Sequence, residues 1–549
     1  RSTMHSHLGA LLLVLSFVGV SAFRNSTQPN VVFLIVESTD GRQWRDESPA
    51  PLPNLRKLMS QGVRFDSHYS NAPVCCPSRA SLWSGRAPHK IKHEHLGLEV
   101  GGVWNNFEGL PQGYDALISN YVEKAGYQVK ISGKTDWTVG GHSENVRLNS
   151  WTMYTPFPYD IPNHGGWDDE TGDCASNGTV VPGNVSAHQG DWKSLNETVA
   201  WIGEVADKGP FFAYQGMSIV HPPYVTNEYW YDQIDPSKVD VPAWAPLDSL
   251  HPCDLQSSML KGCTPSNATA AAFYSTERRR RIRRINYAEV AEFDSMVGAY
   301  MEAVQRAGVA DNTVFIVTSD HGDMRMEHQQ HYKMVPYEAS SHVPLVIGGA
   351  VSASSYGTVV THPTSHLDLF PTISDITAAD KPTYLDGYSL LPWVAPVPNV
   401  SRPSYVVSQF HGCNIAMSWF MIRQGDFKLV VYGTGGDVPH QLFHLPTDPN
   451  EMHNLWLNKA YSEVSKVLEG ELRRWVDYPT VAMDVATYNH AMLKQWTQTT
   501  KDWKDAIKAK DLRWTASWDF NATGSLDAVE RFLAEPPTVR ACRRTLVYP

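Results

Sequence analysis

Two cysteines stand side by side in the segment VCCPSRASLWSGR, which runs from Val74 to Arg86. Adjacent cysteines are poorly placed to bridge each other, because bridged Cα atoms normally lie about 4.4–6.8 Å apart with specific torsion angles. They also lack the separated pairs, such as C-x2-C, that bind zinc in small structural sites. Neither a mutual disulfide nor a zinc site therefore accounts for Cys75 and Cys76.

Acidic residues follow two segments that are predicted as buried strands. The run NVVFLIVESTD supplies Glu37 and Asp40, and VFIVTSDHGDM supplies Asp320 and then His321. In an open α/β sheet, ligands bind beyond the carboxyl ends of the strands. One such carboxylate alone would be explained by a solvated turn, but two favour an oxygen-rich cation site. Ca²⁺ and Mg²⁺ prefer such ligands, although His321 is less usual for calcium.

An alternation of strand-like and helix-like segments must position these residues. The segment LPNLRKLMSQGV is predicted as a helix that ends at Gly62. Further helices are predicted at 114–126, 195–206 and 277–307, and a strand-like run follows each of them. This β-α-β rhythm predicts an α/β fold, with a doubly wound sheet flanked by crossover helices.

The pattern changes beyond about residue 400, after the Pro-rich stretch LPWVAPVPNVSRPS. The segments SYVVSQFHG and FMIRQGDFKLVVYG are predicted as antiparallel strands, with a turn at Gln424-Gly425-Asp426. Helices are expected from about residue 460. We therefore expect a signal peptide at 4–23, a catalytic α/β domain at 24–400 and a smaller C-terminal α+β subdomain at 401–549.

The N-terminal segment MHSHLGALLLVLSFVGVSAF is typical of an export signal. Its apolar stretch, Leu8 to Val20, is followed by the small residues Ser21 and Ala22, and it is shorter than the ~20 residues that a spanning helix needs. Entry into the secretory route without a retained membrane span is the prediction, and an uncleaved anchor is the alternative. Seven N-x-[ST] acceptors fit this route: Asn25, Asn177, Asn184, Asn196, Asn267, Asn399 and Asn521.

Charge and cysteine content limit the classes of protein. Seven cysteines are too few for a disulfide scaffold, and Cys253 with Cys263 is the best candidate for a bridge because they close a short loop. The net charge of −11 and the predicted export disfavour nucleic-acid binding. With 22 histidines, attraction for polyanions would grow in an acidic compartment; an ordinary histidine-rich surface is the alternative. The run ERRRRIRR, 277–284, is a solvated basic face or a track for a sulfated polysaccharide.

The pattern C-x-P-S-R, followed by Leu82 and Ser84-Gly85-Arg86, resembles the signature of the sulfatase family. The resemblance covers roughly residues 30 to 520 and includes MEHQQHYKMVPYEASSHVPL, GYSLLP and QFHGCN. It implies an alkaline-phosphatase-like fold. It also implies that a formylglycine-generating enzyme oxidises Cys75 to an aldehyde, and that Pro-Ser-Arg marks the residue for this conversion.

The resemblance also implies roles for other residues. Glu37, Asp320 and His321, with the modified Cys75, match the ligands of one divalent cation, expected to be Ca²⁺. Family members usually show two adjacent acids after the first strand. Here Ser38 follows Glu37, so Asp40 is a possible substitute ligand.

Three cationic residues match the sulfatase pattern as well. Arg79 matches the arginine that fixes the formylglycine hydroxyl. Lys134 and Lys333 match lysines that bind sulfate oxygens and stabilise developing negative charge.

The general acid is less clear, because Asp136 stands where many sulfatases carry a histidine. His251 in SLHPCD is the preferred candidate to protonate the leaving oxygen, and His221 in IVHPPY is the alternative. A hydrogen-bonded loop residue is the alternative interpretation of each histidine.

The function that follows from the resemblance is hydrolysis of sulfate esters. The subgroup it resembles consists of lysosomal exosulfatases that remove the 2-O-sulfate of glucuronate from heparan-type glycosaminoglycans, so a lysosomal or secreted enzyme is expected. The hydrated aldehyde would attack sulfur through one hydroxyl and release sulfate when the other loses its proton. The alternatives are a sulfatase with another sulfated substrate, a phosphatase or phosphodiesterase of the same fold, and a catalytically silent glycan-binding protein.

Overall fold

The computed structural model describes residues 28–505 with internal gaps, together with a few residues between 530 and 539. The gaps are 96–97, 105, 107–108, 112, 139–177, 247–248, 261–274, 399–400, 412–417 and 434–437. The predicted signal peptide and five of the predicted glycosylation sites lie outside the described residues: Asn25, Asn177, Asn267, Asn399 and Asn521. Asn184 and Asn196 are described and exposed.

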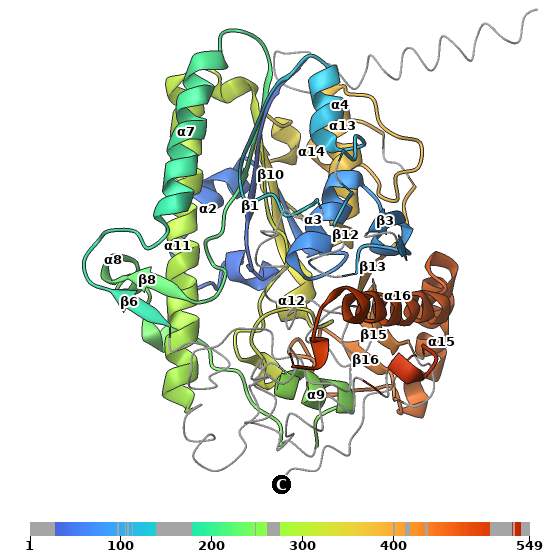
Figure 1. Cartoon of the computed structure of the whole chain (residues 1–549). Helices are drawn as coiled ribbons and strands as arrows, with labels where there is room; N and C mark the ends of the chain where they lie inside the picture. Colours follow the sequence, from blue (N-terminus) through green and yellow to red (C-terminus); the bar gives the residue numbers. More distant parts are fainter. Residues whose placement is uncertain are drawn as a thin grey trace, which may run out of the picture.

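A mixed eight-stranded sheet forms the centre of the molecule (Figure 1). Its strands follow one another in the order β11 (Thr358–Val360), β2 (Gly62–Tyr69), β10 (His342–Gly349), β9 (Thr313–Ser319), β1 (Asn30–Val36), β7 (Phe211–Gly216) and β5 (Gln128–Gly133), with β12 (Thr364–Ser365) beside β2. Strands β9, β1, β7 and β5 are parallel, whereas β10 is antiparallel to both of its neighbours. The predicted α/β fold is confirmed, and the antiparallel β10 is a feature that the sequence reading did not include.

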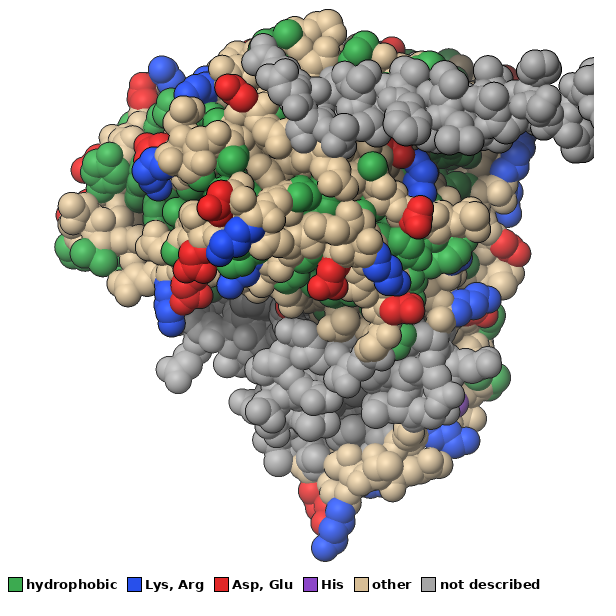
Figure 2. Space-filling view, turned by 90° about the horizontal axis from the view of Figure 1, so that it is seen from above, with side chains coloured by type: hydrophobic (Ala, Val, Ile, Leu, Met, Phe, Trp, Pro, Cys, Tyr) green, Lys and Arg blue, Asp and Glu red, His purple; other side chains and the backbone are tan. Residues whose placement is uncertain are grey.

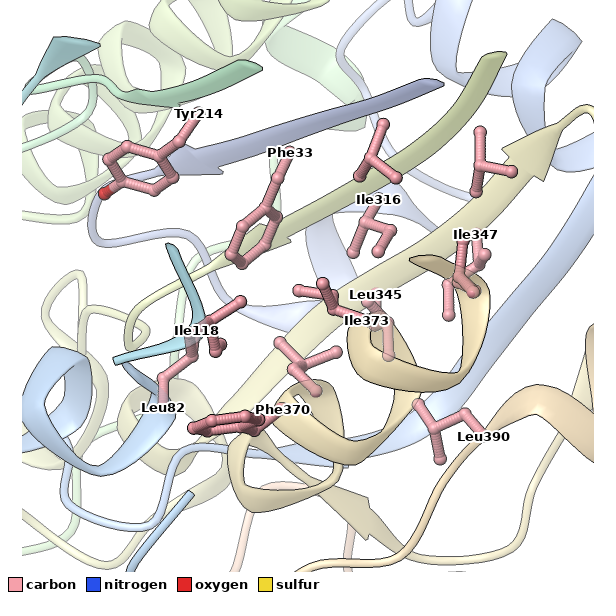
Figure 3. Packing of buried hydrophobic residues seen from close by; sticks show 14 of the residues in the cluster. Phe33, Leu82, Ile118, Tyr214, Ile316, Leu345, Ile347, Phe370, Ile373 and Leu390 are labelled. Carbon is pink, nitrogen blue, oxygen red and sulfur yellow. The ribbon is translucent and has the colours of Figure 1, made fainter. Parts of the chain in front are cut away.

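Helices cover both faces of this sheet (Figure 1). One face packs against α2 (Pro53–Ser60), α7 (Gln189–Val205) and α11 (Thr276–Arg306), and the other against α3 (Cys75–Ser84), α4 (Ile118–Lys124) and α13 (Leu369–Thr377). Alternate side chains of β1 enter the two cores, so its continuous apolar sequence reflects a strand buried on both faces. Figure 3 shows Phe33 of β1 between Tyr214 and Ile316 of the two neighbouring strands.

The predicted helices are present with shifted boundaries. Helix α2 ends at Ser60, and Gly62 already begins β2, so the predicted end at Gly62 is two residues late. Helix α7 begins six residues before the predicted 195, and α4 is shorter than the predicted 114–126. The long helix α11 agrees with the prediction to within one residue at each end.

A second, four-stranded antiparallel sheet follows in the C-terminal part. It contains β13 (Tyr405–Phe410), β14 (Trp419–Gln424), β15 (Phe427–Tyr432) and β16 (Gln441–His444), and α15 (Ser462–Trp475) and α16 (Tyr478–Thr499) pack on one face. The turn between β14 and β15 lies where it was predicted, and the α+β character is confirmed. The boundary between residues 400 and 401 stays a prediction. The other face of this sheet contacts Val74, Tyr332 and Met334, which adjoin the predicted site.

The shorter elements lie mainly in the connections. They are α8 (Glu228–Tyr231), α9 (Pro252–Leu260), α12 (Glu338–Ser341), α14 (Leu391–Val394), β3 (His93–His95), β4 (Leu98–Val100), β6 (Thr179–Val181) and β8 (Val225–Asn227). Cys253 in α9 is disulfide-bonded. Its predicted partner, Cys263, lies outside the described residues, so that pairing stays a prediction. Among the described helices, none is long and apolar enough to cross a bilayer.

Candidate active site

The predicted site residues converge at one edge of the central sheet. Glu37 follows β1, Lys134 follows β5, and Asp320 and His321 follow β9. These strands are parallel, so their carboxyl ends meet at the same edge, where ligands bind in open α/β sheets. Cys75 is the first residue of α3, which begins beside these strand ends.

Four of these side chains form one buried cluster. The ligand atoms of Glu37, Cys75, Asp320 and His321 all lie within 4.8 Å of one another. The sulfur of Cys75 lies 2.9 Å from Oε1 of Glu37 and 3.5 Å from Nε2 of His321. Nδ1 of His321 is 3.0 Å from the carbonyl of Gly322, which leaves Nε2 to face the cluster. The spacing is therefore compatible with shared coordination of one ion.

The protonation states in the cluster also suit a divalent cation. Burial would raise the pKa of Glu37, but the charges of Lys134, His221 and Lys333 outweigh it and hold that pKa well below its usual value. Its Oε2 is buried and has no hydrogen-bond partner among the described residues. Burial lowers the pKa of His321 to about 3, so its imidazole is neutral and able to ligate. The residues present thus fit a cation bound by oxygen and nitrogen.

Asp40, the possible substitute ligand, belongs to a different network. Its carboxylate accepts a hydrogen bond of 2.7 Å from the backbone of Arg42 and pairs with the side chains of Arg42 and Arg325. Burial opposes ionisation, yet these two arginines hold the pKa of Asp40 far below its usual value. The suggestion that Asp40 replaces the missing second acid is therefore not supported by its position.

Two lysines direct positive charge at the same place. Nζ of Lys134 lies 2.5 Å from Oε1 of Glu37, 3.6 Å from the sulfur of Cys75 and 3.2 Å from Oδ2 of Asp136. Nζ of Lys333 lies 3.9 Å from Oε1 of Glu37. Both lysines therefore stand where an anion bound beside residue 75 would meet them.

The Cys75 thiol itself is a poor nucleophile in this environment. Burial, together with the negative charge of Glu37, raises the pKa of Cys75 to about 12, and Lys134 and Lys333 only partly oppose this shift. The thiolate is the reactive form of cysteine, so an unmodified Cys75 would stay protonated and inert near neutral pH. The surroundings suit a precursor residue better than a catalytic thiol.

Arg79 lies beneath the cluster on α3. Its Nε donates to Oδ2 of Asp320 at 2.9 Å, and Nη1 donates to the hydroxyl of Tyr214 at 2.9 Å. Nη2 is buried and makes no hydrogen bond to the described residues. Ser78 donates to the carbonyl of Asp320 at 2.5 Å and contacts His366. Sequence reading missed the support from Tyr214 and His366, which come from distant parts of the chain.

The structure distinguishes the two candidate histidines. Nε2 of His221 lies 3.8 Å from Oε1 of Glu37, and His221 lines the same cavity as Glu37 and Lys134. His251 instead contacts the carbonyl of Pro439 at 2.7 Å and stacks on Tyr432. The preference for His251 as general acid is therefore not supported, because both ring nitrogens of His251 face backbone groups outside the cluster.

Several arginines of the basic run of α11 pack against neighbouring groups, and the polysaccharide track stays a prediction. Arg283 is buried between Asp240 and Glu327, Arg279 lies over the ring of Trp244, and Arg284 lies 3.8 Å from the ring centroid of Tyr231. These arginines fasten the loops that pack on the helix. On the face shown in Figure 2, acidic and basic side chains are interspersed in the described part.

The fold and the buried carboxylate–histidine cluster around C-x-P-S-R define a sulfatase. Residues 29–379 match the Sulfatase family, and residues 326–477 match the description "N-sulphoglucosamine sulphohydrolase, C-terminal". The chain belongs to the sulfatase family and is a sulfuric ester hydrolase.

Among individual proteins, the chain is similar to Arylsulfatase K. It is 32% identical to that of Canis lupus familiaris over 92% of this chain and 93% of the relative, and 31% identical to that of Homo sapiens over 97% and 98%. Its fold is similar to the phosphonate monoester hydrolase of Agrobacterium radiobacter (TM-score 0.63, 23% identity, 81% and 95% covered). It is also similar to BT1596, described as a 2-O GAG sulfatase (TM-score 0.59, 18% identity, 86% and 94% covered).

Proposed function

We propose that the chain removes the 2-O-sulfate of glucuronate from heparan-type glycosaminoglycans, with a formylglycine made from Cys75 and one divalent cation, expected to be Ca²⁺. The observation that carries the proposal is the burial of Cys75, the first residue of C-x-P-S-R, against Glu37, His321 and Lys134. The choice of glucuronate 2-O-sulfate as the substrate rests on the similarity to Arylsulfatase K over nearly the whole chain.

Glu37, Asp320, His321 and residue 75 would hold the cation. A divalent cation held there would supply a Lewis acid to polarise a sulfuryl oxygen and to favour ionisation of a neighbouring hydroxyl. A hydrated aldehyde at position 75 would supply an oxygen nucleophile in place of the inert thiol. Loss of the proton from its second hydroxyl would re-form the aldehyde and break the C–O bond to sulfate. Arg79, whose Nη2 has no described hydrogen-bond partner, can hold a hydroxyl of residue 75 in one orientation.

The remaining side chains bind the ester and complete the proton transfer. Lys134 and Lys333 donate hydrogen bonds to sulfate oxygens and stabilise the charge that develops as the ester bond breaks. His221 protonates the leaving sugar oxygen. Burial and the charge of Lys333 lower the pKa of His221 in the free protein. An anionic sulfate beside the ring would raise that pKa again, so His221 takes up its proton as substrate binds.

The new chain would enter the secretory pathway. The formylglycine-generating enzyme would act on the new chain in the secretory route, and the product would work in the lysosome or outside the cell. The exposed positions of Asn184 and Asn196 support glycosylation at these two sites, and glycosylation at the other five remains proposed as well.

Replacing Cys75 by Ala tests the central claim. We expect Cys75→Ala to abolish hydrolysis of p-nitrocatechol sulfate, because the precursor of the nucleophile is removed. Cys76→Ala is the matched control, since Cys76 is also buried but lies at the variable position of the signature. Peptide mass spectrometry of active wild-type protein should find an aldehyde at residue 75. An unmodified thiol throughout active protein would refute the proposal.

Two further measurements separate this function from the alternatives. Aryl sulfate and aryl phosphate assayed in parallel should show a preference for sulfate, and a preference for phosphate would favour a phosphatase of the same fold. Disaccharides that each carry one sulfate at a known position should show selective loss of the glucuronate 2-O-sulfate.

A further inference from the structure

The cavity beside the cluster has a wall to which the reaction above assigns no role. Its volume is about 370 Å³, and Glu37, Lys134 and His221 form one side of it. The remaining lining residues are Ala187, His188, Ser218, Pro222, Pro223 and Val225. Among these six, His188 carries the ionisable side chain.

The ring of His188 is held in one orientation by neighbours on β8 and α11. It occupies the N-cap position of α7 without using its side chain as a cap, and its N–H donates to Oγ of Ser186 at 2.9 Å. Its Nε2 lies 2.9 Å from the carbonyl of Val225 at the start of β8. A carbonyl can only accept, so Nε2 carries a hydrogen. The fully buried Glu289 of α11 places Oε1 at 3.7 Å from the same nitrogen.

The other ring nitrogen is left for a ligand. Nδ1 of His188 makes no hydrogen bond to the described residues, and the side chain keeps 13% of its surface exposed. Because Nε2 already carries a hydrogen, a second proton would sit on Nδ1 and make it a charged donor. Burial raises the pKa of Glu289 well above its usual value, so the carboxyl group behind Nε2 adds no full negative charge that would repel an anion at Nδ1.

The position of His188 relative to the reacting groups is also set by the fold. Asp191, in the first turn of α7, accepts hydrogen bonds from the backbone N–H groups of Ser218 at 3.0 Å and Ile219 at 2.8 Å. Those residues begin the loop that carries His221. The two histidines therefore line one cavity in a defined arrangement, and the cavity is in the size range of small-molecule sites.

We propose that His188 binds an anionic group, a carboxylate or a second sulfate, on the same sugar whose sulfate ester is cleaved. This inference rests on the proposed function and extends it to substrate choice. A sugar seated with its ester beside residue 75 would present a neighbouring substituent to the opposite wall. An aryl sulfate has no second anion and would not use this contact.

The test compares substrates that differ in one anionic group. We expect His188→Ala to lower kcat/KM for a 2-O-sulfated glucuronate disaccharide about 10- to 100-fold, mainly through KM, because a charge-assisted hydrogen bond is lost. The same disaccharide with its carboxyl group reduced to an alcohol should be cleaved equally by both proteins, as should p-nitrocatechol sulfate. His188→Gln, which keeps a side-chain donor, should recover part of the loss.

The controls separate this role from a structural one. His362→Ala removes a half-buried histidine that contacts the carbonyl of Pro363. This control variant should leave kcat/KM unchanged for every substrate. A loss in His188→Ala that appears only with a disulfated sugar would identify the second sulfate as the bound group. Equal losses on every substrate, or no loss on any, would overturn the inference while leaving the sulfatase assignment intact. A wild-type protein that cleaves no sulfate ester would overturn both.

Discussion

The identity of the proton donor depends on single side chains. His221 and His251 are each followed by proline, and local sequence does not separate them. The hydrogen bond of His251 to Pro439 spans 188 residues, and the contact of His221 with Glu37 joins the loop after β7 to the end of β1. These long-range contacts are the reason that we propose His221 as the acid.

A leaving-group comparison tests this assignment. We expect His221→Ala to lower kcat about 10²- to 10⁴-fold for a sugar sulfate, the range typical of a lost general acid. The loss should be much smaller for p-nitrophenyl sulfate, because nitrophenolate leaves without protonation. His251→Ala should affect both substrates equally and only slightly. A selective effect of His251→Ala on the sugar sulfate would reverse the assignment.

At the scale of elements, the site depends on how closely β5 and β7 approach at their ends. Gly133 and Gly216 are register partners, and a Cβ at Gly216 would lie 1.9 Å from the carbonyl oxygen of Lys134. Because Gly216 has no side chain, the backbone of Lys134 can lie directly against β7. The adjoining lysine is thereby placed beside Glu37.

Replacing Gly216 by Ala should therefore disturb chemistry as well as packing. We expect kcat/KM to fall about 10- to 100-fold, because a displacement of the order of 1 Å at a catalytic group has this effect. Unfolding free energy should fall by about 1–3 kcal/mol from overpacking. Gly203→Ala on the exposed face of α7 is the control, since a Cβ there meets no atom within 4 Å. Unchanged kinetics in Gly216→Ala would show that the close approach does not position Lys134.

At the scale of the whole molecule, a buried charge group joins the two sheets. Lys428 of β15 is fully buried and lies 3.0 Å from Oε1 of Glu338, on α12, and 2.7 Å from Oε1 of Glu451. Burial opposes ionisation of Glu338, but Lys428 holds its pKa at about 2. Burial and the negative charge of Glu338 raise the pKa of Glu451 to about 7, and Lys428 only partly opposes this shift.

Lys428→Met should lower the free energy of unfolding by about 3–5 kcal/mol, since it removes the cation that the buried carboxylates of Glu338 and Glu451 share. Without Lys428, the folded-state pKa of Glu451 would rise further above its unfolded value, because burial and Glu338 raise it and Lys428 opposes them. Stability would then be retained at low pH and lost as pH rises. The difference in Tm between Lys428→Met and wild type should therefore become smaller as the pH falls from 7.5 to 5. Lys466→Met in the exposed Lys466–Glu463 pair should change Tm little. A Tm difference between Lys428→Met and wild type that does not change with pH would contradict the proposed sharing of Lys428 by Glu338 and Glu451.

Much of the fold and the chemistry was accessible from local sequence. Strand β1 could be recognised because burial on both faces requires an unbroken apolar run, and the acids that follow β1 and β9 had to lie at one edge. Cys75 was identified because C-x-P-S-R is a contiguous pattern. Each of these features is encoded within about ten neighbouring residues.

The tertiary structure alone decided the features that depend on distant partners. The antiparallel direction of β10, the pairing of Asp40 with Arg325, the contact of His221 with Glu37, and the position of His188 in the cavity beside Glu37 all depend on such contacts. A side chain's sequence neighbours set its local conformation but not what faces it across the fold. Local sequence therefore specified which groups could react, and the packing of the sheets and loops selected which of them meet.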